Sequence, residues 1–290
     1  MHDETDDTVR VAAPAKLNLY LHVTGRRDNG YHELDSLVAF AHISDVITAR
    51  AASGLELEMD GPFAQDLPDN GTNLVLAAAK ALRTHTGITS GAALTLTKNL
   101  PVASGIGGGS ADAAAVIKAL ARLWGLHPGH FDLSGLALDL GADVPVCLFG
   151  RPAFMGGIGE DIEAAPALPE TALVLVNPGV AVSTPEVFKA RDGAFTAPAR
   201  FEASPPGAAA LAAVLIQRGN DLAPPAIALA PVIDQALTAL AATPACLMAR
   251  MSGSGATCFG LFANDDQAAD AARGLEQAHP DWWVQASRLI

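Results

Sequence analysis

The 290-residue chain contains few cysteines, and they are far apart. Cys147, Cys246 and Cys258 lie in separate apolar segments, so they are expected to be reduced thiols in the core. None of the three has a neighbouring Cys or His at the spacing of a metal site. These observations exclude a small secreted domain held by disulfides and a cysteine-based zinc module.

Long hydrophobic runs are also missing from the sequence. No apolar segment is long enough to cross a membrane, and the N-terminus, MHDETDDTVR, is acidic and polar. Such a terminus is neither a secretion signal nor a transit peptide, so we expect a cytoplasmic protein without a membrane partner. Half of the residues are hydrophobic and 17% are charged, which is typical of a globular chain with a large core.

Basic residues are scarce relative to acidic ones. The 18 Lys and Arg residues face 31 Asp and Glu residues, which gives a net charge of −13. Nonspecific nucleic-acid binding needs a basic surface, so this balance argues against it. An anionic substrate would have to be attracted by a few placed cations, backbone N–H groups or a metal ion. The charge does not decide between a monomer and a homodimer.

Strand and helix patterns follow one another without a regular rhythm, which predicts an α+β fold. Gly150, Arg151 and Pro152 indicate a boundary between two domains, 1–150 and 151–290. The predicted strands are 17–25, 45–52, 55–59, 92–98, 152–160, 171–179, 246–251, 256–263 and 282–289. The predicted helices are 74–85, 109–124, 131–141, 208–217, 227–242 and 265–278, and 192–209 is expected to be an exposed loop.

The most informative segment is 101–115, which reads PVASGIGGGSADAAA. Glycines let a ligand approach the backbone, and the start of a helix offers unpaired N–H groups and the positive end of its dipole. A Walker loop would need a lysine after Gly109, and a dinucleotide fingerprint would need glycine in place of Ser110. The segment therefore predicts a phosphate cradle of another kind, built from the N–H groups of 105–111.

Three polar residues stand in apolar surroundings and are candidates for chemistry. Lys16 and Asn18 share one face of the first predicted strand, because side chains alternate along a strand. Lys16 could instead be an edge residue whose amine reaches water. Asp143 lies in the apolar segment 140–150, where a carboxylate needs a partner, although turn-forming and helix-capping aspartates are common.

Two short segments suggest ligand contacts. Tyr31 and His32 follow an Asn-Gly turn, and this pair suits stacking on a nucleobase and hydrogen bonding to its edge. Tyr31 could equally pack at the rim of the core. The Ser-Gly-Ser-Gly turn at 252–255 could line a ligand channel or simply connect two strands.

Four of these segments, taken in order, resemble the GHMP kinases, a family named for galactokinase, homoserine, mevalonate and phosphomevalonate kinases. The segments are 13–37, 101–115, 140–150 and 251–260. The resemblance extends from about residue 10 to the C-terminus and is weak across 190–245. The first segment is similar to the branch of the family that acts on a cytidine-diphosphate-linked methylerythritol.

The resemblance implies a two-domain α+β GHMP kinase fold with the active site in the cleft between the domains. The N-terminal domain would be ribosomal-protein-S5-like and the C-terminal domain ferredoxin-like. The implied activity is ATP-dependent and Mg²⁺-dependent phosphorylation of the 2-hydroxyl of that small-molecule substrate. Two alternatives stay open, namely another GHMP kinase that acts on homoserine, mevalonate or a sugar, and a catalytically silent nucleotide-binding protein.

The resemblance also implies roles for particular residues. Lys16 and Asp143 match the catalytic pair, in which the lysine keeps the aspartate ionised. The substrate positions are Asn18, Tyr31, His32, Thr184 and Phe188. The ATP positions are Pro101, Val102, Ala103, Ser104, Gly105, Ile106, Gly107, Gly108, Gly109, Ser110 and Ala111, with Asn73 near the adenine and Ser110 a candidate Mg²⁺ ligand. The family usually has glycine at 103 and 104, leucine at 106 and often serine at 111, so we expect a stiffer first half of the loop.

Overall fold

The computed structural model describes residues 8–67, 73–127 and 131–290. Contacts divide the chain into two compact units. Unit 1 contains the chain up to Ala15, Ser44–Val102 and Gly108–Phe149, and unit 2 contains Lys16–Ile43, Ala103–Gly107 and Gly150–Ile290. One break falls between Phe149 and Gly150, while the others divide two long strands and the glycine-rich loop. The division into two domains, 1–150 and 151–290, therefore stays a prediction from the sequence.

The two long strands are β1 (Val9–Arg26) and β2 (His32–Ala52), which pair with each other. In unit 2, the first part of β2 pairs with β5 (Ala153–Gly157), which in turn pairs with β6 (Asp161–Ala164). In unit 1, the last part of β2 pairs with β4 (Gly91–Thr97), and β4 runs parallel to β3 (Leu55–Asp60). The predicted strands are present, but β6, the first part of β2 (32–44) and the first part of β1 were not predicted.

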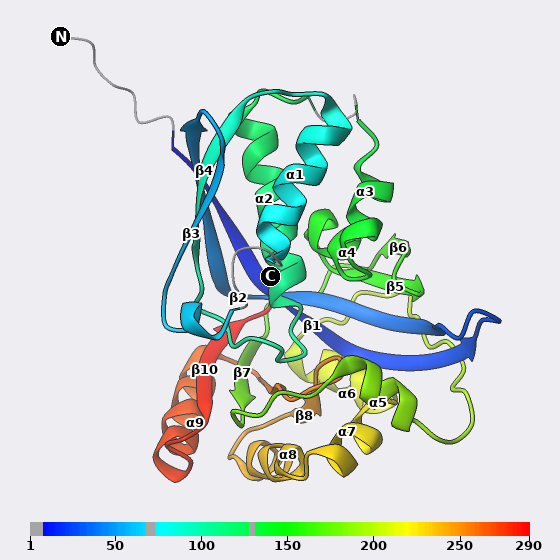
Figure 1. The fold of residues 1–290 in the computed structure, drawn as a ribbon. Coiled ribbons are helices and arrows are strands. Elements are labelled where there is room, and N and C mark those ends of the chain that lie inside the picture. The colour runs from blue at the N-terminus through cyan, green and yellow to red at the C-terminus, as the bar shows by residue number, and fades with distance from the viewer. Residues whose placement is uncertain (1–7, 68–72, 128–130) are drawn as a thin grey trace. The chain divides into compact units, whose positions relative to one another are not determined.

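The helices of unit 1 are α1 (Leu74–Thr86), α2 (Gly108–Leu123), α3 (Leu133–Leu140) and α4 (Val144–Phe149), preceded by the short helix η1 (Ala64–Asp66). Helices α1 and α2 lie side by side, and α1 packs on β3 (Figure 1). The Asn73 side chain caps α1 by accepting a hydrogen bond from Val75 N at 2.9 Å. At the other end Gly87 adopts a left-handed conformation, with φ of +69°. These ends confirm the helix predicted at 74–85.

Unit 2 contains a second, antiparallel sheet with the strand order β10-β7-β9-β8. Its strands are β7 (Ala172–Asn177), β8 (Met248–Met251), β9 (Cys258–Phe262) and β10 (Trp283–Arg288). Helices α5 (Thr184–Ala190), α6 (Ala208–Ile216), α7 (Ala223–Leu229) and α8 (Val232–Ala242) connect β7 to β8, and α9 (Asp265–Ala278) connects β9 to β10 (Figure 1). This order of strands and helices is ferredoxin-like, as the resemblance to the GHMP kinases implies.

The core of unit 2 lies between this sheet and helices α8 and α9. All six residues of β7 are buried, in keeping with its five apolar residues, and the final Asn177 donates a hydrogen bond to Thr257 Oγ1 at 2.9 Å. Helix α9 buries Ala268, Ala271, Ala272 and Leu275, the spacing of one helical face, and Asn264 caps it. The structure confirms the helix at 265–278. The helix predicted at 227–242 is wrong as a single element, because Pro231 cannot continue the hydrogen bonding of a helix interior and separates α7 from α8.

The loop predicted at 192–209 has no helix or strand up to Gly207, and hydrogen bonds attach it to the rest of unit 2. Buried Asp35 accepts hydrogen bonds from Ala199 N at 2.7 Å, from Arg200 Nε at 2.9 Å and from the Tyr20 hydroxyl at 2.9 Å. Burial and the Asp35 charge raise the pKa of Tyr20. The loop is thus anchored by a buried carboxylate along part of its length.

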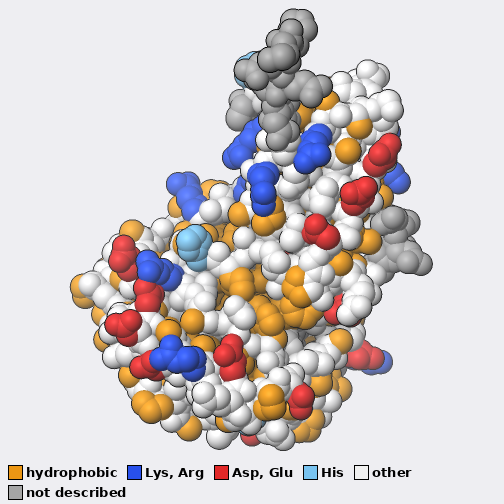
Figure 2. All heavy atoms as spheres, turned by 90° about the vertical axis from the view of Figure 1, so that its left-hand side faces the viewer, with side chains coloured by type: hydrophobic (Ala, Val, Ile, Leu, Met, Phe, Trp, Pro, Cys, Tyr) orange, Lys and Arg blue, Asp and Glu red, His pale blue; other side chains and the backbone are white. Residues whose placement is uncertain are grey.

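The surface carries charges of both signs. On the face shown in Figure 2, acidic and basic side chains are interspersed and neither sign forms a continuous area. Across residues 8–67, 73–127 and 131–290, no helix combines the length and the apolar character that a bilayer span requires.

Candidate functional site

The first half of the glycine-rich loop, Ala103–Gly107, belongs to unit 2. Its backbone is irregular, with φ of +50° at Ala103, +76° at Gly105 and +62° at Gly107. Two of its carbonyl oxygens accept backbone hydrogen bonds, that of Ser104 from Thr257 N at 3.0 Å and that of Ile106 from Lys16 N at 2.9 Å. The half-loop is therefore fixed to β1 and to the 252–257 segment.

The Ser-Gly-Ser-Gly turn holds this half-loop in place. Ser252 Oγ donates a hydrogen bond to Gly105 O at 3.0 Å and accepts one from Asn18 N at 3.1 Å. A Cβ atom at Gly105 would lie 2.5 Å from Gly255 O and 2.6 Å from Ser252 O, so only glycine fits there. The turn thus does more than connect two strands, because it is a docking surface for the loop.

The second half of the loop, Gly108–Ala111, opens helix α2 in unit 1. The helix predicted at 109–124 is confirmed to within one residue at each end. A Cβ atom at Gly109 would meet nothing closer than Leu74 Cδ2 at 4.0 Å, whereas one at Gly108 would lie 3.1 Å from Lys98 Nζ. Ser110 lies in the first turn and is half-buried. This half presents the unpaired N–H groups of a helix start.

Below Gly108 lies a group of buried charges that we call the ion cluster, formed by Asp45, Lys98 and Asp112. Lys98 Nζ lies 2.5 Å from Asp45 Oδ2 and 2.7 Å from Asp112 Oδ2. Burial lowers the pKa of Lys98, but the two carboxylates outweigh it and the pKa is raised. Burial and Asp45 raise the pKa of Asp112 to about 7, against the opposing effect of Lys98. Sequence reasoning missed this cluster, although an aspartate among alanines at 112 is a signal for it.

Lys16 and Asn18 lie on one face of β1, as the strand period predicts. Lys16 Nζ donates to Asn18 Oδ1 at 2.8 Å, and Asn18 Nδ2 donates to Ser36 Oγ at 2.8 Å. Lys16 is only 3% exposed, so the alternative of an edge lysine reaching water is wrong. The relay fixes the direction of the lysine side chain.

Asp143 lies directly before helix α4 in unit 1. Its backbone oxygen accepts a hydrogen bond from Cys147 N at 3.2 Å, which starts the helix, and its side chain is half-buried. The backbone of Asp143 therefore lies at the start of a helix, as the turn or cap alternative predicts. The carboxylate is held at a helix start, where its charge is favourable.

Tyr31 and His32 follow a tight turn, as predicted. Asn29 Oδ1 accepts a hydrogen bond from Tyr31 N at 3.1 Å, and Gly30 has φ of +89°. Tyr31 is 62% exposed, so the alternative of packing at the core rim is wrong. The His32 ring stacks on Phe188 of α5, with centroids 5.2 Å apart and planes 19° apart.

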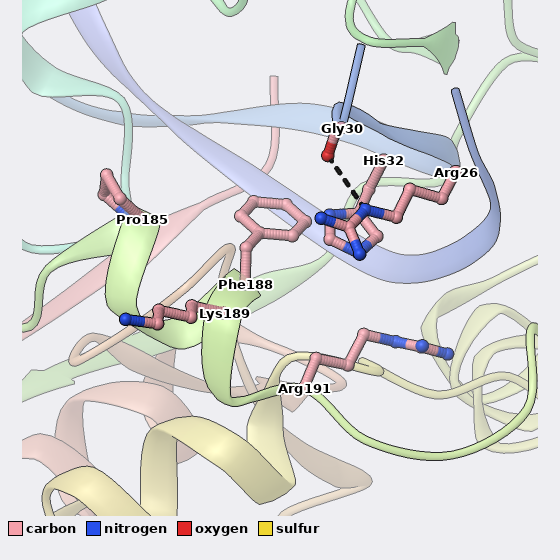
Figure 3. Close-up of a pocket in the computed structure, with 7 residues that line it drawn as sticks. All are labelled: Arg26, Gly30, His32, Pro185, Phe188, Lys189 and Arg191. Atoms are coloured by element: carbon pink, nitrogen blue, oxygen red, sulfur yellow. Dashed lines mark hydrogen bonds between the residues drawn. The ribbon is translucent and has the colours of Figure 1, made fainter. Parts of the chain in front are cut away.

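The stacked rings line a cavity of about 330 Å³ in unit 2 (Figure 3). Its remaining lining residues are Arg26, Gly30, Pro185, Lys189 and Arg191, so three cations surround an aromatic pair. Burial, Arg26 and Arg191 lower the pKa of His32, and its imidazole is therefore neutral at pH 7. Such a cavity can bind a ring through stacking and an anion through its cations. Sequence reasoning missed the three cations.

Thr184 connects this cavity to the loop-holding turn. Its hydroxyl lies 2.7 Å from Ser254 Oγ, within hydrogen-bond distance, at the first residue of α5. The loop 103–107, Asn18 and helix α5 thus meet at one turn, 252–255. Within the described parts of the chain, no three His, Cys, Asp or Glu side chains are grouped so that they could hold a metal ion.

Comparison with known proteins gives two family matches. The family described as GHMP kinases N terminal domain matches residues 73–151, and GHMP kinases C terminal matches residues 204–281. A protein of Paramagnetospirillum magneticum named 4-diphosphocytidyl-2-C-methyl-D-erythritol kinase is 56% identical, covering 97% of this chain and 98% of its own. A protein of the same name from Rhodospirillum rubrum is 54% identical, covering 98% of this chain and 93% of its own.

Solved structures agree with these matches. The crystal structure of a 4-(cytidine 5'-diphospho)-2C-methyl-D-erythritol kinase is 35% identical with a TM-score of 0.76, and the match covers 97% of this chain and 98% of that one. A homoserine kinase from Cytophaga hutchinsonii has a TM-score of 0.71 at 19% identity, covering 99% and 96% of the two chains. The latter likeness concerns the fold alone.

Proposed function

Because the chain belongs to the family of 4-diphosphocytidyl-2-C-methyl-D-erythritol kinases within the GHMP kinases, we propose that it transfers the γ-phosphoryl group of ATP to the 2-hydroxyl of that substrate. The single observation that carries this proposal is the identity above 50% to proteins of that name over almost the whole chain. The reaction would take place in the cytoplasm, as a step of non-mevalonate isoprenoid precursor synthesis.

The cavity beside α5 supports a cytidine diphosphate as part of the substrate. His32 and Phe188 line the cavity and offer ring surfaces for the base, and the exposed Tyr31 precedes His32 in the chain. The neutral His32 imidazole can both donate and accept a hydrogen bond. At a separation of 5.2 Å the His32 and Phe188 rings leave no room for a base between them. For cytosine to lie between Tyr31 and Phe188, His32 must therefore move aside. Arg26, Lys189 and Arg191 would attract the diphosphate.

The glycine-rich loop fits the phosphates of ATP. The start of α2 offers unpaired N–H groups, and Gly109 leaves open space where a side chain would otherwise project. When bound, ATP supplies the phosphoryl group and Mg²⁺ neutralises charge on its phosphates. Mg²⁺ commonly has only one or two protein ligands, and phosphate and water complete its coordination. A single protein ligand would therefore be enough, and Ser110 is the candidate. We place Asn73 on the adenine side.

Asp143 would act as the general base for the attacking hydroxyl. Asp143 lies directly before helix α4, and its carboxylate can accept a proton from the substrate. Lys16, whose amine is fixed by Asn18, would stabilise negative charge that develops on the transferred phosphoryl group. Asn18 and Thr184 are proposed substrate contacts, because both lie against the turn 252–255.

The two alternative functions have less support. The homoserine kinase above and a mevalonate kinase of known structure are 19% and 14% identical to this chain, a likeness that concerns the fold alone. A silent nucleotide-binding protein would not need the buried relay that orients Lys16.

The test is an assay of purified protein with ATP, Mg²⁺ and 4-diphosphocytidyl-2-C-methyl-D-erythritol, in which ADP release is followed and the product identified by mass. We expect a singly phosphorylated product, and in Asp143→Ala a kcat lowered at least about 100-fold while ATP still binds. Asp139→Ala, which removes an exposed carboxylate from α3 of the same unit, should keep normal turnover. Near-normal kcat in Asp143→Ala would contradict the assignment of the base. No turnover by the folded wild-type chain would contradict the proposed function.

A further inference from the structure

The ion cluster contacts the chain on both sides of the glycine-rich loop. Asp45 Oδ1 accepts hydrogen bonds from Asn99 N at 2.6 Å and from Leu100 N at 2.8 Å, the residues that lead into the loop. Asp112 lies one turn into α2, the helix that leads out of it. Lys98 Nζ joins the two carboxylates. The entry and the exit of the loop are therefore tied to the same three charges.

Stability alone is a weak reason for this cluster. Each of the three side chains is at most 3% exposed. Removing charges from water costs several kcal/mol per ion, and well-packed apolar side chains are often at least as stabilising. Asp112 Oδ1 is moreover buried without a hydrogen-bond partner, which adds to the cost. What ion pairs supply that apolar contacts do not is a fixed distance and direction between the groups they join.

The position of Lys98 relates the cluster to the phosphate-binding backbone. Its amine lies 3.1 Å from the place where a Cβ atom of Gly108 would be, directly beneath the first residue of α2. A movement of α2 away from Lys98 would therefore break the Lys98–Asp112 pair, and a movement toward it is limited by the amine that lies close to Gly108. The cluster restrains the helix start at its first turn.

We propose that Lys98 and Asp112 are positioning residues for ATP, which hold the start of α2 in register with residues 99–100 so that the loop N–H groups meet the phosphates. The proposal rests on the proposed function, since it assumes that ATP phosphates bind at this loop. Neither side chain contacts the phosphates, and both act through the backbone that they fix.

The decisive variant is Asp112→Leu. It leaves Lys98 paired with Asp45, so the remaining charges balance, but it frees the loop exit from the cluster. We expect the KM for ATP to rise at least about ten-fold, since small displacements of binding groups have effects of this size, while the KM for the alcohol substrate changes less than about two-fold. Asp112→Asn keeps an oxygen that accepts from Lys98 and should restore the KM for ATP to within about three-fold of wild type.

Lys118→Met is the matched control. This lysine lies on the same helix and is half-buried, but its amine donates to Cys147 O, away from the loop. Its KM for ATP should equal that of the wild type. An unchanged KM for ATP in folded Asp112→Leu, or an equal rise in both KM values, would overturn the proposal.

Should Asp112→Leu fail to fold, Asp112→Ala takes its place under the same criteria, because it also leaves Lys98 paired with Asp45 and adds no volume to the core. The wild-type enzyme separates the two proposals. If the wild type does not consume ATP, the proposed function fails. If it does and the variants keep its KM for ATP, only the positioning role fails.

Discussion

The two halves of the glycine-rich loop are held by different kinds of interaction. Ala103–Gly107 is irregular and is fixed by backbone and hydroxyl hydrogen bonds to the turn 252–257 and to β1. Gly108–Ala111 is the regular start of α2 and lies above buried charges. The first half depends on the absence of a side chain at Gly105, whereas the second half depends on charges at some distance along the chain. One phosphate loop can thus be placed by steric fit at one end and by ion pairs at the other.

The largest difference between the two halves is expected when Gly105→Ala is compared with Gly109→Ala. At Gly105 the methyl group would overlap two carbonyl oxygens at φ of +76°, so we expect a loss of several kcal/mol of stability and of most activity. At Gly109 the methyl group has space, and alanine favours a helix, so stability should change by less than about 1 kcal/mol. Thermal unfolding of both variants measures the contrast in stability. Equal effects of the two substitutions would contradict it.

A smaller effect is expected from Ser252→Ala. The variant loses the hydroxyl that donates to Gly105 O and accepts from Asn18 N, so two buried groups lose a partner. We expect destabilisation of about 2 kcal/mol in chemical denaturation and a raised KM for ATP. Ser254→Ala, which removes only the contact with Thr184, should leave the KM for ATP unchanged and affect the alcohol substrate instead. A wild-type KM for ATP in Ser252→Ala would show that the turn does not place the loop.

The smallest effect concerns the pH dependence of the second half. The pKa of Asp112 is raised from 3.8 to about 7 in the folded state, so between these values the folded chain binds more protons than the unfolded one and stability falls as pH rises. Lys98 and Asp45 are the charged groups that face it. Asp112→Asn lacks this loss, so its stability relative to wild type should rise between pH 5 and pH 8. Melting temperatures at both pH values measure this gain, and an equal difference at the two values would contradict the assignment.

Local elements could be predicted from the sequence wherever a pattern and a cap agree. Asn73 and Asn264 each precede an apolar face at helical spacing, and helices α1 and α9 begin there. The loop was predicted as a phosphate cradle from its glycines and the helix that follows, and its role remains a prediction. Pro231 was a visible break that the helix prediction at 227–242 overlooked.

Long-range arrangements could not be predicted in the same way. Nothing in the local pattern says that β4 lies between β3 and β2, or that Ser252 contacts Gly105. The ion cluster joins Asp45 of β2, Lys98 directly after β4 and Asp112 of α2, which are far apart in the sequence. Only Asp112, which lies among alanines, has a local signal of burial. The structure shows that the three charges are buried in contact with one another. A single sequence does not show directly which residues are buried.

The cationic cavity beside α5 has a consequence for how anions reach this protein. With a net charge of −13, the chain repels an approaching anion at long range, and Arg26, Lys189 and Arg191 attract it only nearby. At physiological ionic strength charges are screened beyond about 8 Å, so most of the repulsion is hidden until the ligand is almost in contact. Salt in the surrounding solution therefore helps an anion to approach this acidic molecule, and the three cations act on it only over the last few ångströms.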